Sequence, residues 1–353
     1  SVAVDVSPEF AWSFRTDIAT WSDPPATFHL GGPFADGAQG RTMMPGQPPW
    51  VWSIRDVRPG RSFAIEMALD RATIRFEWLF DAAPSGTTKL TQRIILSGAN
   101  APAYKEQVEA GFASTLSDGM KRIAEQMEQE IPLSGGRTTH GVARIGDTIR
   151  RPITKRATFV HDLLKHLEGR GFAGAPRFLG IDSRGREMLS FLPGSVPSEL
   201  GAFSDDQLAA AARLLRQLHD ATLDCSLRDG HEVVCHGDAS PCNCVFVEGA
   251  PAAFIDFDGA HPGSRFEDLG YAAWLWIDIG NDELSADLQG GRVADFFRSY
   301  GTDSADAIAA ITAAQRALSE RTDFSGVREW SNQCRAWVEH NRDALLAAVA
   351  ARA

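Results

Sequence analysis

The chain lacks the features that mark secreted, membrane-spanning and strongly basic proteins. Its 353 residues include only five cysteines, an odd number, so we expect no disulfide framework and a reducing, cytoplasmic location. No apolar run approaches the roughly twenty residues that a membrane-spanning helix needs. No basic segment followed by an apolar one opens the chain as a leader. These absences predict a soluble protein with no membrane partner.

Positive charge is also scarce. Lys and Arg total 35 against 46 Asp and Glu, a formal net charge of −11. Because an acidic chain repels nucleic-acid phosphates and anionic lipid, we expect no nucleic-acid partner. The content of 44% hydrophobic and 23% charged residues is typical of a globular protein, and the length favours two domains.

The first part of the chain has mostly the pattern of β-strands. Residues 2–6 alternate valine with other residues, which predicts a strand, and Ser7-Pro8-Glu9 is typical of a helix start. Short helices are expected at 8–14 and 18–21. Further strands are expected at 27–32, 38–44, 50–57, 62–69, 72–81 and 87–97. The tight Gly, Pro and Asp connections between them indicate an antiparallel meander.

One long helix is expected to close this part and to cover the sheet. It is predicted from an apolar stripe at helical spacing: Val108, Phe112, Leu116, Met120, Ile123 and Met127. The order of strand, two short helices, six strands and a long helix resembles the helix-grip fold of the START and polyketide-cyclase superfamily (SRPBCC), over residues 1–130. The resemblance implies a cavity for an apolar ligand. Aromatic residues are available to line such a cavity or to form an ordinary core: Phe28, Trp50, Trp52, Phe63, Phe76, Trp78 and Phe80.

A second region begins near residue 131. Ser134-Gly135-Gly136 predicts a turn, followed by strands at 139–145 and 147–151 joined at Gly146-Asp147. Ser204 and Gln207 form a capping-box pattern that starts a helix. The other expected elements are a helix at 158–169, strands at 176–181 and 186–192, and helices at 266–279, 283–300, 303–320 and 326–351. We find no internal repeat.

The stretch that carries chemistry follows an apolar strand, after which His236 and Gly237 turn the chain so that Asp238 projects from a loop. Asn243 precedes the next expected strand, and Asp256 follows the one after it. Because those two strands are antiparallel neighbours, Asn243 and Asp256 are expected at one edge, beside Asp238. Two carboxylates and an amide at such short range need a cation, and hard oxygen ligands favour Mg²⁺.

The sequence from His236 to Asn243, followed by Ile255-Asp256-Phe257, resembles the catalytic core of the aminoglycoside phosphotransferase family. The resemblance covers about 131–353 and implies a kinase-like, bilobal α+β fold, with a small lobe at about 131–193 and a helical large lobe at about 194–353. It implies that His236 and Asp238 are catalytic, Asp238 being the base for a substrate hydroxyl. It also implies that Asn243 and Asp256 hold Mg²⁺ against the phosphates of ATP or GTP. In Glu267-Asp268-Leu269, the acid of the Asp-Leu pair, Asp268, is expected to support the loop.

The same resemblance directs attention to the nucleotide-binding residues. Gly135 and Gly136 fit a hairpin that covers phosphates. Where kinase-like folds place a phosphate-binding lysine, this chain has Arg150 and Arg151, and an arginine can bind phosphate through two hydrogen bonds. Arg151 is the first choice and Arg150 the second; the alternative is that both lie on a solvated strand edge. The helix at 158–169 offers no obvious glutamate partner for this cation.

Three smaller features admit two interpretations each. Cys242 and Cys244 suggest a metal or redox pair, but thiols two residues apart on a strand point to opposite faces, which favours packing. His219 either supports the catalytic loop or carries a proton. Asp258 is either a second carboxylate near the metal or a loop cap.

Three functions are consistent with these patterns. The favoured one is transfer of the terminal phosphate of ATP or GTP to a hydroxyl of a small molecule that the sequence does not identify. The alternative is a catalytically weak or silent sensing protein whose helix-grip cavity binds an apolar ligand, because the expected lysine and helix glutamate are missing. In a third, the first domain acts on an aromatic, polyketide-like compound, although it shows no paired acid and base.

Overall fold

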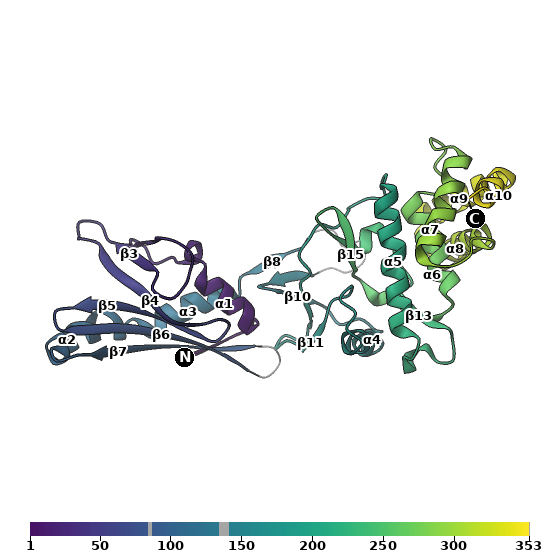
Figure 1. Cartoon of the computed structure of the whole chain (residues 1–353). Coiled ribbons are helices and arrows are strands. Elements are labelled where there is room, and N and C mark those ends of the chain that lie inside the picture. The colour runs from purple at the N-terminus through teal and green to yellow at the C-terminus, as the bar shows by residue number, and fades with distance from the viewer. Residues whose placement is uncertain (84–86, 134–140, 353) are drawn as a thin grey trace. The chain divides into compact units, whose positions relative to one another are not determined.

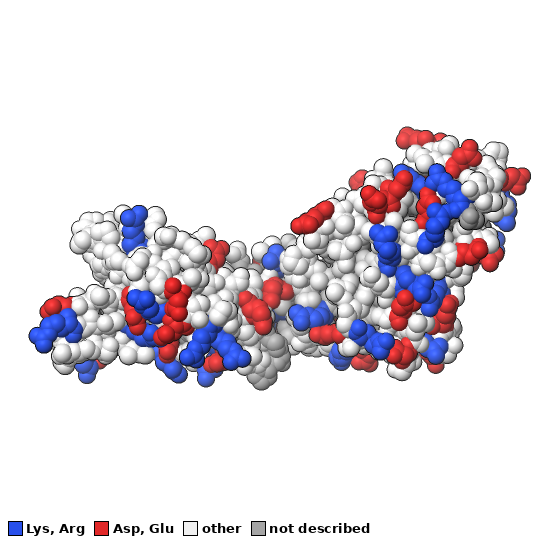
Figure 2. Space-filling model, viewed as in Figure 1, with Lys and Arg blue, Asp and Glu red and all other residues white. Residues whose placement is uncertain are grey.

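The computed structural model describes residues 1–83, 87–133 and 141–352. Contacts divide the chain into two compact units, the first comprising Ser1–Pro152 with Leu179–Leu189, and the second Ile153–Phe178 with Ser190–Ala353. Among the described residues, no helix is both long enough and apolar enough to cross a bilayer. On the face shown in Figure 2, acidic and basic side chains are interspersed over each unit.

The first unit contains an antiparallel sheet of seven strands in the order β1-β7-β6-β5-β4-β3-β2 (Figure 1). The strands are β1 (Val2–Val4), β2 (Thr27–Leu30), β3 (Gln39–Met43), β4 (Trp50–Arg58), β5 (Ser62–Leu69), β6 (Ala72–Ala82) and β7 (Thr88–Ser97). Every neighbouring pair is antiparallel. The predicted meander is therefore confirmed, with strand limits within about two residues of those expected.

Two short helices follow β1, as expected: α1 (Pro8–Thr16) and the 3₁₀ helix η1 (Ile18–Thr20). The Ser7 side chain caps α1 by accepting a hydrogen bond from the Phe10 N–H. Buried side chains from α1, the sheet and the closing helix form one core, which includes Ala11, Trp52, Phe63, Trp78 and Met120. Figure 1 shows α1 and the closing helix α3 beside the sheet.

The prediction of a single long helix after β7 is wrong. The chain instead forms α2 (Ala101–Val108), a π-helical turn at Glu109–Ala113, and α3 (Leu116–Met127). Gly111 weakens helix formation within this turn. The Ser114 hydroxyl then donates to the Ala110 carbonyl at 2.7 Å, a back-bond of the kind that bends helices.

A second sheet has the order β11-β12-β10-β9-β8. Its strands are β8 (Glu130–Pro132), β9 (Ala143–Ile145), β10 (Thr148–Arg151), β11 (Phe178–Ile181) and β12 (Glu187–Ser190). The predicted turn at Gly146-Asp147 is confirmed, because Thr148 pairs with Ile145 across it and Gly146 has a φ of 60°. Strand β8 was not expected, and residues 139–140 of the predicted strand lie outside the described residues.

The helices of the second unit are α4 (Ala157–Gly169), α5 (Asp205–Thr222), α6 (Arg265–Ile277), α7 (Ala286–Tyr300), α8 (Ala307–Arg321), α9 (Ser325–His340) and α10 (Arg342–Ala350). The predicted capping box at Ser204 and Gln207 is present. The expected helix at 326–351 is wrong as a single element. It breaks at Asn341, whose side-chain amide donates to the Trp337 carbonyl at 2.9 Å.

Two short antiparallel pairs lie among these helices and carry the motif. They are β13 (Val233–Cys235) with β16 (His261–Gly263), and β14 (Cys244–Val247) with β15 (Ala250–Phe254). Strand β16 was not expected. The motif residues therefore lie at the ends of short buried strands and at the start of α6.

Candidate active site

The catalytic-loop candidate begins where the buried strand β13 ends. Gly237 has a φ of 78°, and a Cβ built there would lie 2.2 Å from the Gly259 carbonyl oxygen. Only glycine fits this close approach of two backbones. The turn that it permits leads directly to Asp238, whose side chain is half-buried at the protein surface.

A buried carboxylate on α6 holds this turn by hydrogen bonds to its backbone. Asp268 accepts hydrogen bonds from the backbone N–H groups of His236, at 2.6 Å, and Gly237, at 2.9 Å. Burial opposes its ionisation, but hydrogen bonds from His219 and the loop hold the pKa of Asp268 below its usual range. The loop-supporting role suggested for this acid agrees with the geometry.

His219, in the last turn of α5, belongs to the same support. Its Nε2 lies 3.1 Å from Asp268 Oδ2, and its Nδ1 lies 2.7 Å from the Tyr300 hydroxyl. Burial raises the pKa of Tyr300 to about 12, so this hydroxyl stays protonated and donates to His219. Because the imidazole is fully buried between these two partners, the structure favours loop support over proton transfer.

His236 connects two segments of the site. Its Nε2 lies 3.2 Å from the carbonyl of Ile255, and its Nδ1 accepts from the Asp238 N–H at 3.3 Å. Burial lowers the pKa of His236, so the neutral ring donates from Nε2 and accepts at Nδ1. His236 thereby ties the loop that bears Asp238 to the residue that precedes Asp256.

Asn243 and Asp256 lie at the same end of the β14–β15 pair. Cys244 pairs with Phe254, and the Ile255 N–H donates to the Asn243 carbonyl at 2.9 Å. The Asn243 side-chain amide donates to the Asp238 carbonyl at 3.1 Å. Because Nδ2 of Asn243 makes this hydrogen bond, its amide oxygen is the atom that can bind a metal. Asp256 offers a half-exposed carboxylate, and oxygen ligands of both kinds fit Mg²⁺.

The sequence reasoning missed a direct partner of Asp238. The Tyr271 hydroxyl donates to Asp238 Oδ1 at 2.9 Å. Burial raises the pKa of Tyr271 well above its usual value, and the charge of Asp238 raises it further, so Tyr271 stays a hydrogen-bond donor. Tyr271 lies three residues after Asp268 on α6, a spacing that places both on the face toward the loop and could have identified it.

The residues proposed for nucleotide binding have different environments. Gly135 and Gly136 lie outside the described residues. Arg151 is buried in β10 and forms an ion pair with Glu187 of β12, a carboxylate partner that the sequence did not reveal. Arg150 is 1% exposed; its guanidinium donates to the Asp5 carbonyl at 2.8 Å and faces Asp182. Burial of both side chains excludes the solvated-edge interpretation.

The two cysteines of the loop are not a strand pair. Cys242 lies in the 3₁₀ turn η5 (Pro241–Asn243), whereas Cys244 is buried in β14. The expectation that both lie on one strand is therefore wrong, because Pro241 starts a helical turn there. Burial raises the pKa of Cys244 to about 12, which agrees with a packing role.

These elements and this loop form the candidate active site of a mixed α+β chain. Residues 221–308 match the phosphotransferase enzyme family. The chain is also 31% identical over 264 residues to the trifolitoxin immunity protein of Rhizobium leguminosarum bv. trifolii, an alignment that spans 64% of this chain and 100% of that protein. The chain belongs to the phosphotransferase enzyme family.

Solved structures of kinases and phosphotransferases resemble the chain more distantly. A choline/ethanolamine kinase family protein from Mesorhizobium loti has 16% identity and a TM-score of 0.42, over 66% of this chain and 98% of its own. The aminoglycoside phosphotransferase APH(3'')-Id from Streptomyces rimosus, in complex with ADP and streptomycin, has 13% identity and a TM-score of 0.40, over 66% and 98%. Choline kinase from Cryptosporidium parvum Iowa II has 10% identity and a TM-score of 0.44, over 65% of this chain and 94% of its own. Identities this low transfer no substrate to this chain.

Proposed function

We propose that the protein transfers the terminal phosphate of ATP or GTP to a hydroxyl group of a small molecule. The observation that carries this proposal is the hydrogen-bonded loop that presents Asp238 beside Asn243, whose backbone is bonded to the residue preceding Asp256. Asn243 and Asp256 would hold Mg²⁺, which when bound supplies positive charge to the nucleotide phosphates.

In this proposal, Asp238 is the base and Tyr271 positions it. The Tyr271 hydroxyl occupies Oδ1 of the carboxylate, so Oδ2 is the oxygen that accepts the proton of the acceptor hydroxyl. His236 and Asp268 hold the backbone of the loop, so that the carboxylate needs no reorganisation before the reaction. His236 is thus a positioning residue.

For the nucleotide we propose Arg151 as the main cation, with Arg150, Gly135 and Gly136 as further binding residues. The ion pair with Glu187 supports Arg151 because it fixes the direction of the guanidinium. Arg150 is the weaker candidate, since Asp5 and Asp182 already face its guanidinium.

We further propose residues 1–130 as a helix-grip domain and 131–353 as the phosphotransferase domain. The order of elements in the seven-stranded unit supports the first assignment. Its aromatic side chains contact one another: Phe63 lies within 4.9 to 6.3 Å, between ring centroids, of Trp12, Phe34, Phe80 and Trp78. This packing favours a structural core over a ligand cavity.

The test of the main proposal is nucleotide turnover by the full chain with Mg²⁺ and a panel of hydroxylated small molecules. Asp238→Asn should lower kcat at least about 100-fold, because the proton acceptor is lost. Asp282→Asn, a matched change at an exposed position, should leave the rate unchanged. Turnover by Asp238→Asn at the wild-type rate would contradict the proposal, as would wild-type protein that binds no nucleotide with Mg²⁺.

A second candidate, protection against a toxin, is favoured by the relative that the chain covers completely. Cells that express the wild-type chain would then survive a toxin that kills control cells. The same Asp238→Asn variant separates the mechanisms. If protection needs phosphoryl transfer it is lost in this variant, whereas protection by binding alone is retained.

A further inference from the structure

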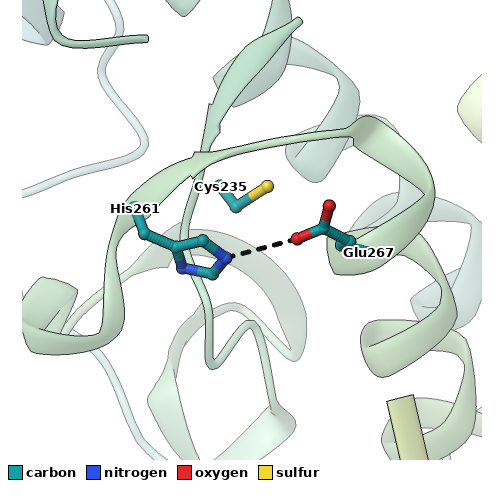
Figure 3. A group of neighbouring side chains, drawn as sticks. All are labelled: Cys235, His261 and Glu267. Carbon is teal, nitrogen blue, oxygen red and sulfur yellow. Dashed lines mark hydrogen bonds and ion pairs between the residues drawn. The ribbon is translucent and has the colours of Figure 1, made fainter. Parts of the chain in front are cut away.

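A second group of side chains with ligand chemistry lies next to the loop but takes no part in the proposed reaction. Cys235 ends β13, His261 begins β16, and Glu267 lies in the first turn of α6. Cys235 and His261 are directly paired across the two strands. Figure 3 shows the three side chains directed into one space, and their ligand atoms all lie within 4.8 Å of one another.

The separation between His261 and Glu267 suits a transition-metal ion. Bonds of about 2.0–2.3 Å to nitrogen, oxygen and sulfur put the ligand atoms of a tetrahedral Zn²⁺ about 3.3–3.8 Å apart. His261 Nε2 and Glu267 Oε2 are 3.5 Å apart. Gly263 keeps the space between the ligands open, since a Cβ there would lie 2.8 Å from Cys235 Sγ and 2.9 Å from Glu267 Oε2.

The hydrogen bonding of the imidazole leaves the right atom for a metal. His261 Nδ1 lies 2.9 Å from the Gly259 carbonyl, which can only accept, so Nδ1 carries the proton. Nε2 faces the Glu267 carboxylate, whose charge favours a positive partner: either a second proton on the ring or a metal ion bound to the Nε2 lone pair. A backbone carbonyl that binds the far nitrogen is the usual support of a metal-ligating histidine.

The charges around the thiol also favour a cation. Burial raises the pKa of Cys235, and the negative charges of Asp268, Glu267 and Glu232 raise it further. The same carboxylates attract a divalent ion, and coordination deprotonates a thiol that would otherwise stay neutral. The Cys235 side chain is fully buried, whereas His261 and Glu267 are 34% and 59% exposed, so the open side of the site faces solvent.

We propose that Cys235, His261 and Glu267 bind one transition-metal ion of Zn²⁺ type, with water in the fourth position. The thiolate and imidazole distinguish this site from the oxygen ligands Asn243 and Asp256, which suit Mg²⁺. The ion would join β13, β16 and α6 at the residues adjoining His236 and Asp268. It would therefore stabilise the base of the catalytic loop, whatever the acceptor of the phosphoryl group.

The experiment is titration of the metal-free, full-length protein with Co²⁺ in excess Mg²⁺, followed by absorption spectroscopy. One equivalent of Co²⁺ should produce the near-ultraviolet charge-transfer band of a cobalt–thiolate bond, and Zn²⁺ should displace it. Cys235→Ser should remove the band. Cys242→Ser, a thiol in the same loop that is outside the cluster, should retain it, as should Asn243→Ala. A band that persists in Cys235→Ser, or no band in the wild type, overturns the proposal.

Glu267→Gln provides a test at a position where folding is not at risk. Glutamine can keep the capping hydrogen bond that Glu267 accepts from the Ser264 N–H, and the side chain is largely exposed. The site loses a charged ligand, so its affinity for Co²⁺ should fall at least about tenfold. If the affinity is unchanged in this variant, Glu267 is not a ligand and the proposed three-residue site is overturned.

Discussion

At the scale of single residues, the loop conformation depends on glycines at which an added Cβ atom would be costly. Gly237 and Gly249 both have positive φ, at 78° and 81°, but only Gly237 lies against another backbone. A Cβ built at Gly249 would meet no atom within 4 Å other than its own chain neighbours. The two glycines therefore separate the cost of a left-handed conformation from the cost of a steric clash.

We expect Gly237→Ala to lower the free energy of unfolding by more than about 2 kcal/mol and to abolish activity, because the Gly259 backbone must move. Gly249→Ala should cost only about 1 kcal/mol, the penalty for φ alone. Urea unfolding of both variants measures the difference. Equal costs would show that the approach of Gly237 to Gly259 is not tight in solution.

Tyr271→Phe tests whether Tyr271 positions Asp238, the proposed base. Removal of one hydroxyl frees Asp238 Oδ1, so the carboxylate becomes less well oriented. We expect kcat to fall about tenfold with little change in KM or in the melting temperature. Tyr104→Phe, on α2 of the other unit, is the control and should leave both constants unchanged. An unchanged kcat in Tyr271→Phe would show that the tyrosine is structural.

At the scale of elements, the first turn of α6 joins the strand end to the helical region. Asp268 accepts hydrogen bonds from backbone N–H groups of the loop and from the His219 imidazole of α5. One carboxylate of α6 thus connects the loop, α5 and α6. The Trp276 indole, further along α6, donates to the Ala239 carbonyl at 2.9 Å and holds the far side of the same loop. Side chains of α6 therefore hold the loop by hydrogen bonds at both of its ends.

Asp268→Asn should destabilise the protein by about 2–4 kcal/mol near neutral pH, because a neutral amide cannot replace a carboxylate that accepts from several donors. The pKa of Asp268 is lowered on folding, so its contribution is complete above its unfolded value of about 4 and is lost as pH falls through the folded value. The wild type should therefore lose more stability than the variant between about pH 5 and about pH 3. Denaturant unfolding at each pH measures both slopes, and parallel slopes would contradict this role.

Much of the element order could be predicted because capping, period and turn residues act locally. Ser7 starts α1, the Ser204–Gln207 capping box starts α5, and the strands of the first sheet end at their Gly and Pro turns. The predictions of helix length failed where a polar side chain interrupted a helix whose apolar pattern looked continuous. Hydroxyl back-bonding near Ser114 and the amide of Asn341 interrupted helices whose apolar residues kept their spacing.

At the scale of the whole molecule, the chain forms two compact units that each have their own buried core. The first contains a seven-stranded meander whose strands pair with their sequence neighbours, apart from β1 with β7. The second gathers loop residues from distant segments around α5 and α6. The match to the phosphotransferase enzyme family at residues 221–308 falls on this second assembly, which contains Asp238, Asn243, Asp256 and Asp268.

The sequence by itself determined the motif and the strand ends that carry it, because these follow from residue type and local spacing. Only the tertiary structure decided that Tyr271 contacts Asp238, that Glu187 pairs with Arg151, and that Cys235, His261 and Glu267 share one space. Each of these contacts joins residues from different elements. Their meeting depends on how helices and strands pack, which no local pattern encodes.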